Sequence, residues 1–218
     1  MTAAPCGLEP EPSHSRRRWC GPQRRIGLTG GIATGKSTVA AILSGSHGLP
    51  VLDADVYARQ LLAPGTTASQ AVLDRYGQQV QTPSGALDRR ALGRMIFARP
   101  GERRWLEALT HPLVKEAFTR DLAWHHRAAT VVLVAPLLLE AGLEALCSEV
   151  WLVDLDEASQ LERLLARDRL NPHEARQRIQ AQWPLVRKHG LADVILKNHG
   201  DFVALAQQVD MALAGQAT

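Results

Sequence analysis

A glycine-rich stretch near the N-terminus, GLTGGIATGKST at residues 27–38, constrains the fold more than any other feature. It contains the spacing G-x-x-x-x-G-K-[ST], with Gly30, Gly35, Lys36 and Ser37 at the fixed positions. An apolar run precedes it and the alanine-rich segment VAAIL follows, which indicates a strand, a loop and a helix. Glycines in such a loop let consecutive backbone N–H groups surround phosphate oxygens, and the helix N-terminus adds partial positive charge. The stretch therefore predicts a binding loop for a nucleoside triphosphate.

The loop also assigns roles to individual side chains. We expect Lys36 to contact the β- and γ-phosphates as a point charge, and the Ser37 hydroxyl to coordinate Mg²⁺. The residues expected to bind the nucleotide are Gly30, Gly31, Ile32, Ala33, Thr34, Gly35, Lys36, Ser37 and Thr38. Any demand for a positive φ at Ala33 would cost on the order of 1 kcal/mol. The alternative is a glycine-rich turn that contains Lys and Ser by chance.

The rest of the chain reads as an α/β protein with a parallel sheet flanked by helices. The segments RRIGLT, PVLDAD, TVVLVAP, EVWLVDL and ADVILKN have the apolar, β-branched character of strands. Between the second and third of these, residues 56–127 show apolar residues at the three- and four-residue spacing of helices, interrupted at PGTT, TPSG and RPG. The pattern predicts a sheet that is split by a helical insertion.

Charge is concentrated at the N-terminus. The chain has 25 lysines and arginines against 22 aspartates and glutamates. Residues 1–25 hold five arginines and two glutamates, which accounts for the whole net charge of +3. A neutral body argues against nucleic acid as the partner. Residues 1–23, rich in Pro, Gly, Ser and Arg, are predicted to be a flexible extension outside the fold.

Cysteine usage and hydropathy indicate the compartment. The three cysteines form no C-x-x-C pair, so neither a zinc site nor a disulfide framework is predicted. The longest apolar run, VVLVAPLLL at residues 131–139, is too short to cross a bilayer. We expect a cytoplasmic protein without a membrane partner, present as a monomer or weak oligomer.

Two aspartates lie at the end of the second predicted strand. Asp53 and Asp55 are two residues apart, so on a strand their side chains point the same way, toward the carboxyl edge where ligands bind in open α/β sheets. A carboxylate there can accept the proton of an attacking hydroxyl or help to hold Mg²⁺. The alternative for Asp55 is a helix N-cap before VYARQLL.

Further candidates lie downstream. Arg163 and Arg167 are four residues apart on one helix face, where they can close over a phosphoryl group or simply form a solvated surface. His111 precedes Pro112, which is expected to break the helix there and direct His111 toward the site or mark a helix junction. Glu140 follows the apolar VAPLLL segment and either faces the cleft or ends a buried run.

Several short motifs occur in a specific order: GLTGGIATGKST, VLDAD, LDRRALGRMIF, THPLV, VAPLLLE, RLLARD and Q-x-x-x-x-x-K-x-x-x-A-D. Together, from about residue 26 to 198, they resemble the dephospho-coenzyme A kinase family. The resemblance implies transfer of the ATP γ-phosphate to the ribose 3′-hydroxyl of dephospho-coenzyme A, with ATP and Mg²⁺ as cofactors. Two positions depart from the usual pattern: Ala33 replaces a further glycine, and Arg169 replaces a small residue.

The resemblance also implies roles and boundaries. Asp55 is then the catalytic base, Lys36, Arg163 and Arg167 act on the transferring group, and Asp53, His111 and Glu140 bind substrate. The implied divisions are an extension at 1–23, a nucleotide-binding core at 24–55, 130–162 and 189–218, a substrate-binding insertion at 56–129 and a lid at 163–188.

Three alternatives stay open at this point. A kinase of the same class can act on another acceptor, such as a nucleoside or nucleotide, and only the helical insertion would decide that. A nucleotide-driven switch or motor ATPase is expected to carry a further recognition motif, and a guanine-type N-K-x-D is absent. A nucleotide-binding module without catalysis would need fewer of the residues Lys36, Ser37, Asp53 and Asp55.

Overall fold

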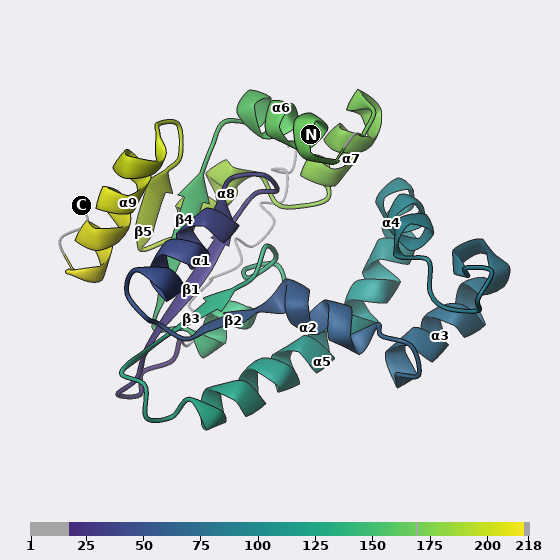
Figure 1. Ribbon diagram of the computed structural model, residues 1–218, viewed down its shortest axis with the longest axis horizontal. Helices are drawn as coiled ribbons and strands as arrows, with labels where there is room; N and C mark the ends of the chain where they lie inside the picture. The colour runs from purple at the N-terminus through teal and green to yellow at the C-terminus, as the bar shows by residue number, and fades with distance from the viewer. Residues whose placement is uncertain (1–17, 169, 216–218) are drawn as a thin grey trace, which may run out of the picture.

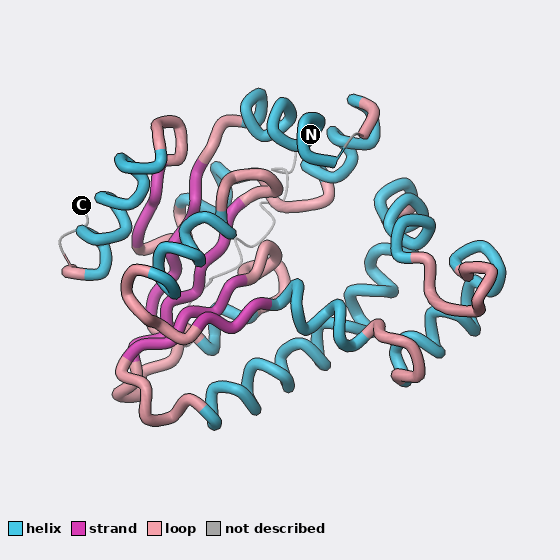
Figure 2. Tube along the Cα trace, viewed as in Figure 1, coloured by secondary structure: helices cyan, strands magenta, loops and turns pink. Residues whose placement is uncertain are grey.

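The computed structural model describes residues 18–168 and 170–215. In this part of the chain, five parallel strands form one sheet in the order β2-β3-β1-β4-β5 (Figures 1 and 2). The strands are β1 (Arg24–Gly30), β2 (Val51–Asp53), β3 (Thr130–Val134), β4 (Glu149–Asp154) and β5 (Val194–Lys197). Four of them lie within segments that the apolar pattern predicts as strands, and β1 extends one residue beyond its predicted segment, to Gly30. The α/β class is confirmed.

The register brings the ends of these strands to one edge of the sheet. β1 occupies the centre, with Leu28 opposite Val134 of β3 and Trp151 of β4. Asp53, the last residue of β2, also lies opposite Val134. Because all five strands run parallel, the loop after β1 and the aspartates after β2 emerge at the same edge.

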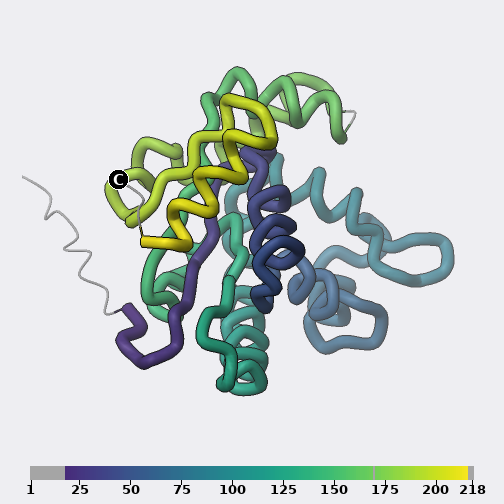
Figure 3. Tube along the Cα trace, turned by 60° about the vertical axis from the view of Figure 1, so that its left-hand side comes forward, coloured from purple at the N-terminus to yellow at the C-terminus, as the bar shows by residue number. Residues whose placement is uncertain are grey.

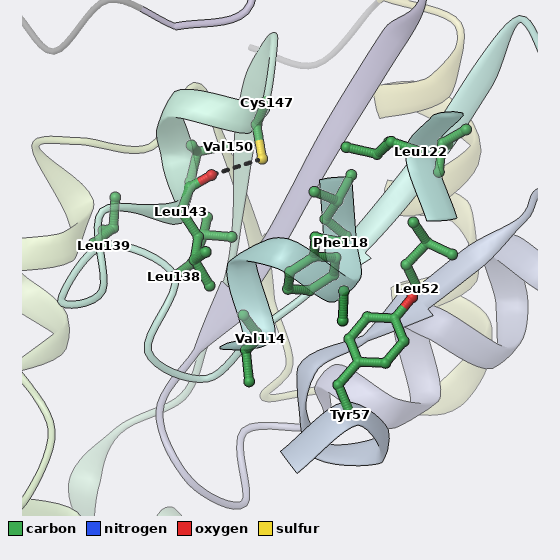
Figure 4. Close-up of a cluster of buried hydrophobic side chains, with 14 residues drawn as sticks. Leu52, Tyr57, Val114, Phe118, Leu122, Leu138, Leu139, Leu143, Cys147 and Val150 are labelled. Carbon is green, nitrogen blue, oxygen red and sulfur yellow. Dashed lines mark hydrogen bonds between the residues drawn. The ribbon is translucent and has the colours of Figure 1, made fainter. Parts of the chain in front are cut away.

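Helices cover both faces of the sheet. One face packs against α1 (Lys36–Gly45) and α9 (Phe202–Leu213), which lie side by side in Figure 3. The other face packs against α2 (Ala54–Leu61), α5 (Pro100–Trp124) and the chain around η2 (Leu143–Leu146). Figure 4 shows this second cluster, in which the rings of Tyr57 and Phe118 meet edge to face with centroids 5.1 Å apart. Alternate residues of β3 thus point into separate cores, Val131 and Leu133 into one and Val132 and Val134 into the other.

The segment between β2 and β3 is helical, as its periodicity predicts. It extends away from the sheet (Figure 2) and has a small apolar core of its own that includes Val72, Leu92 and Leu106. Besides α2 and α5 it contains α3 (Thr67–Tyr76), η1 (Gly77–Val80) and α4 (Arg89–Ala98). Helix α5 continues through Pro112, so the helix break expected there is wrong. The proline removes one hydrogen bond without ending the helix.

The charged segment after β4 forms two helices. These are α6 (Glu157–Asp168) and α7 (Pro172–Gln180), which contact each other and lie above the sheet edge in Figure 1. Arg169, one of the two departures noted in the sequence, lies outside the described residues. A short helix, α8 (Leu185–His189), then leads to β5. None of the described helices combines the length and the apolar character needed to cross a membrane.

Residues 18–23 belong to the folded body, which corrects the prediction of a flexible extension up to residue 23. Arg18 forms an ion pair with Asp193, and the guanidinium of Arg25 stacks 3.5 Å from the centre of the Trp19 ring. The Gln23 side chain is 8% exposed and donates to the backbone carbonyls of His125 (2.8 Å) and Ala128 (2.9 Å). The composition of residues 1–23, on which the prediction was based, does not indicate these long-range contacts. Residues 1–17 lie outside the described part of the chain.

We predict that Gln23→Ala lowers the free energy of unfolding by about 1–2 kcal/mol, because the two partly buried hydrogen bonds from its amide to the backbone are lost. Equilibrium denaturation in urea measures the change. The matched control is Gln70→Ala, since Gln70 is exposed and, within the described part of the chain, its side chain bonds to Asp74 on its own helix. The control should stay within about 0.5 kcal/mol of the parent. Equal small effects at both positions would show that residue 23 does not hold the N-terminal segment in place.

Candidate active site

The glycine loop lies between β1 and α1, as its motif predicts. Gly35 has φ 97°, and a Cβ there would come within 2.2 Å of the side-chain nitrogen of Asn198. That nitrogen donates to the carbonyl of Thr34 at 2.8 Å. Asn198, which directly follows β5, therefore stabilises the loop. Only glycine fits position 35. The sequence motifs give no reason to single out Asn198, because its partner is 164 residues away.

Ala33 adopts the left-handed conformation that the sequence analysis identified as costly. Its φ is 61°, and no other non-glycine residue in the described ranges has a positive φ. An alanine in this conformation carries strain of about 1–2 kcal/mol. The loop geometry is therefore kept in spite of the missing glycine, because the flanking strand and helix impose it.

Lys36 folds back onto the loop. Its Nζ donates to the carbonyls of Gly30 (3.1 Å) and Gly31 (2.7 Å). Desolvation, together with the positive charge of Lys188, lowers the pKa of Lys36 to about 8, while Asp55 opposes this shift. The ammonium group is thus held by weak neutral acceptors that an anion can replace. Ser37, at the start of α1, is exposed.

The two aspartates have different positions and partners. Asp53 ends β2 and is the N-cap of α2, because its Oδ1 accepts from the N–H of Asp55 at 2.7 Å. Asp55 is not the cap but lies in the first turn of the helix, so the two residues do not share a strand face. Burial and the charge of Asp53 raise the pKa of Asp55, and Lys36 opposes this effect. Asp53 therefore caps α2, whereas Asp55 lies in the first turn of that helix, and both residues line the cavity described next.

A cavity of about 480 Å³ opens at this edge of the sheet. One wall is the glycine loop, and apolar residues of the insertion, including Phe97, Leu106 and Val114, form another. The charged and polar side chains around it come from α1, β2, α2, α5, α6 and α7. They are those of Lys36, Ser37, Asp53, Asp55, Arg103, Glu107, Thr110, His111, Arg167, Arg178 and Gln182. The cavity thus joins the phosphate loop, the aspartates and an apolar surface.

The two predicted lid arginines have separate environments. Arg167 lines the cavity and forms hydrogen bonds of 2.7 and 3.1 Å with the carboxylate of Asp168. Asp168 also accepts from Arg178 at 3.1 Å, so one carboxylate holds two cavity arginines. Arg163 is not among the cavity residues, and its guanidinium donates to the carbonyl of Asn198 at 3.1 Å. Arg163 therefore lies beside the loop support rather than over the cavity.

His111 and Glu140 were both predicted to bind substrate, and they are near enough for the charge of Glu140 to counteract, in part, the lowering of the pKa of His111 by burial, but they differ in their position relative to the cavity. His111 lines the cavity, where burial lowers its pKa and so favours the neutral imidazole. Glu140 does not line the cavity: its Oε1 accepts from Nζ of the fully buried Lys188 at 2.8 Å and from the N–H of Trp183 at 3.0 Å. Glu140 thus connects Lys188 and the backbone at Trp183, a role that the sequence pattern did not indicate.

Several polar cavity residues were given no role from the sequence, among them Arg103, Arg178 and Gln182, the last of which begins one of the family-like motifs. Arg103 lies on α5 and contacts Glu107 at 3.6 Å, Arg178 lies on α7 above the ring of Phe97, and Gln182 follows α7. Arg178 and Gln182 are four residues apart in the sequence, the spacing of one helix face, although α7 ends at Gln180 and Gln182 lies beyond it. That spacing was the available signal, but charged helical segments usually show it for solubility alone.

The donor set at the loop suits Mg²⁺. Among the described residues, no group of three or more His, Cys, Asp or Glu side chains is placed to hold a metal by itself. Mg²⁺ does not require one, since it is commonly held by one or two protein oxygens, waters and substrate phosphates. The exposed Ser37 hydroxyl and the carboxylate of Asp53 both face the cavity and are oxygen ligands of this kind.

We predict that Ala33→Gly raises the free energy of unfolding by about 0.5–1 kcal/mol, because glycine relieves the strain of the positive φ. Chemical denaturation of the two proteins gives the difference. The matched control is Ala41→Gly at an exposed position of α1. There glycine should lower stability by about 1 kcal/mol. A loss of stability at both positions would contradict a strained Ala33.

Comparisons with known proteins identify the family and agree with the fold. The family model of dephospho-CoA kinase matches residues 24–204. A dephospho-CoA kinase of Synechococcus sp. (strain CC9605) is 59% identical over 179 residues, which cover 82% of this chain and 86% of that protein. The crystal structure of TT1252 from Thermus thermophilus has a TM-score of 0.74 and 34% identity, covering 91% of this chain and all of that one. A dephospho-CoA kinase from Campylobacter jejuni shares the fold, with a TM-score of 0.59 and 23% identity over 88% of this chain and 96% of its own. The chain belongs to the dephospho-CoA kinase family.

Proposed function

We propose that this protein transfers the γ-phosphoryl group of ATP to the ribose 3′-hydroxyl of dephospho-CoA, which yields CoA and ADP. Membership of the dephospho-CoA kinase family supports the substrate pair. The structural observation that carries the proposal is that Lys36, Asp55 and Arg167 line one cavity. In-line phosphoryl transfer needs a phosphate-binding loop, a carboxylate that accepts the proton, and a positively charged side chain near the transferring group.

Each of three cavity residues has a separate role in the proposed reaction. The 3′-hydroxyl oxygen attacks the γ-phosphorus, the bond from that phosphorus to the β–γ bridging oxygen breaks, and the hydroxyl proton passes to Asp55. The raised pKa of Asp55 suits a proton acceptor that must later release the proton. Lys36 exchanges the carbonyls of Gly30 and Gly31 for phosphate oxygens, and Arg167 neutralises charge on the transferring group.

Mg²⁺ supplies charge neutralisation and orientation of the phosphates when it is bound. In this proposal the Ser37 hydroxyl and Asp53 hold it. Asp53 can do so through the carboxylate oxygen that does not cap α2, since only Oδ1 accepts from the N–H of Asp55. The same residue thus fixes the start of the helix that presents Asp55 and offers an oxygen to the metal.

The helical segment at 56–129 then binds the acceptor, and the segment at 163–188 acts as the lid. Phe97 and Leu106 offer an apolar wall, while Arg103 and Arg178 offer guanidinium groups to an acceptor that carries a diphosphate. We place the reaction in the cytoplasm, where a reducing environment suits the unpaired Cys20 and Cys147.

The first test is incubation of the purified protein with MgATP and dephospho-CoA, with products read by mass. We expect CoA and ADP in equal amounts and little ADP without acceptor, because the lid completes the site only with both substrates. Asp55→Asn should lower kcat by at least about 100-fold, because the proton acceptor is lost.

The matched control for that substitution is Asp74→Asn on α3, an exposed carboxylate whose hydrogen-bond partner among the described residues is Gln70 of the same helix. It should leave kcat within twofold of the parent. ADP release without a phosphorylated acceptor would favour the ATPase alternative, and phosphorylation of a nucleoside instead would change the acceptor. A fully active Asp55→Asn protein would remove Asp55 as the base.

We predict that the pH profile of kcat/KM for ATP has an alkaline limb near pH 8, where Lys36 loses its proton in the free protein. The acid limb reports Asp55, which is active as the carboxylate, so the rate falls as the pH drops through its raised pKa. Asp53→Asn removes a negative neighbour and keeps a capping oxygen. It should therefore lower the pKa of Asp55 and move the acid limb to lower pH. If the acid limb does not move in this variant, the acid limb does not report the ionisation of Asp55.

A further inference from the structure

The side chain of Gln182 bonds directly to the backbone of the glycine loop. Its Oε1 accepts a hydrogen bond from the N–H of Ile32 at 2.8 Å. Ile32 lies inside the loop, Gln182 lies just beyond the end of α7, and both line the cavity. This contact joins the phosphate loop to the segment that carries the cavity arginines.

The contact uses a donor that the loop is built to offer to phosphate. Backbone N–H groups inside such a loop are the donors for phosphate oxygens, and the N–H of Ile32 is already occupied by an amide oxygen. A phosphate oxygen that takes this N–H must displace Oε1. Glutamine tolerates the exchange because its amide can rotate and present the NH₂ group as a donor. A glutamate at this position can only accept.

The contacts on either side of Gln182 determine which neighbouring segment can move when Gln182 is displaced from Ile32. On its C-terminal side, the N–H of Trp183 donates to Glu140 at 3.0 Å, and the buried Lys188 bonds to the same carboxylate at 2.8 Å. These bonds fix the chain from residue 183 onward to the core. On the N-terminal side, Arg178 is attached to α6 through Asp168. A displacement of Gln182 therefore passes to α7 and not to α8.

We propose that Gln182 is a positioning residue that couples nucleotide occupancy of the glycine loop to the placement of Arg178 and Arg167. With the loop empty, the bond to Ile32 holds the end of α7 against the loop. When a phosphate oxygen takes the Ile32 N–H, the end of α7 is released, and both arginines move with it because Asp168 joins them. This inference rests on the proposed binding of ATP at the loop.

The test is Gln182→Met, which keeps the length of the side chain and removes the acceptor. Titration calorimetry with MgATP, without any acceptor, should give binding about three- to tenfold tighter than the parent, because no hydrogen bond must be broken first. In the complete reaction kcat should fall at least tenfold. Tighter nucleotide binding together with slower transfer is a combination that a merely structural residue would not produce.

A second variant, Gln182→Glu, keeps the acceptor, cannot donate and adds a negative charge. It should bind MgATP at least tenfold more weakly than the parent. The matched control is Gln180→Met, since Gln180 is exposed at the end of α7. It should stay within twofold of the parent in both measurements.

The inference is overturned if Gln182→Met binds MgATP as the parent does or more weakly, or if it keeps the parental kcat. These outcomes leave the proposed kinase activity untouched, because the parent still binds MgATP and phosphorylates dephospho-CoA. A parent protein that fails to bind MgATP would overturn the proposed function and this inference together.

Discussion

The buried ion pair between Glu140 and Lys188 connects the parts of the molecule that must act together. Lys188 is fully buried, bonds to Glu140 at 2.8 Å and donates to the carbonyl of Pro136 at 3.0 Å. The pair therefore ties α8 to the chain that leaves β3, and its positive end lies close enough to lower the pKa of Lys36. Removing either partner would leave an uncompensated buried charge, which typically costs about 3–5 kcal/mol. The pair thus fixes the chain that follows α7 and, after desolvation, contributes to the lowered pKa of Lys36.

Local patterns predicted the parts of this fold that depend on local forces. The glycine loop follows from spacing, because backbone approach and helix polarity act over a few residues. The strands follow from runs of β-branched residues, because strands buried on both faces are apolar throughout. The role of Asp53 was ambiguous: two aspartates at a strand end look alike until β2 is seen to end at Asp53 and α2 to begin at Ala54.

The remaining features depend on partners far apart in the chain. Asn198 supports Thr34, Gln182 bonds to Ile32, and Lys188 neutralises Glu140, and none of these pairs has a spacing that a local pattern can reveal. Residues 18–23 were misjudged for the same reason, since Arg18 and Gln23 look like linker residues until their partners are known. The motif therefore located the site, while the side chains that support it came from the three-dimensional arrangement.

The strand order has a consequence for how the protein is made. The phosphate loop emerges early from the ribosome, yet β1 pairs with β3 and β4, which follow the whole helical insertion. The loop also needs Asn198, close to the C-terminus. Joining segments so distant carries a large loop-closure cost and slows folding. The helical insertion has a core of its own, but the nucleotide site is assembled only when nearly the entire chain has been synthesised.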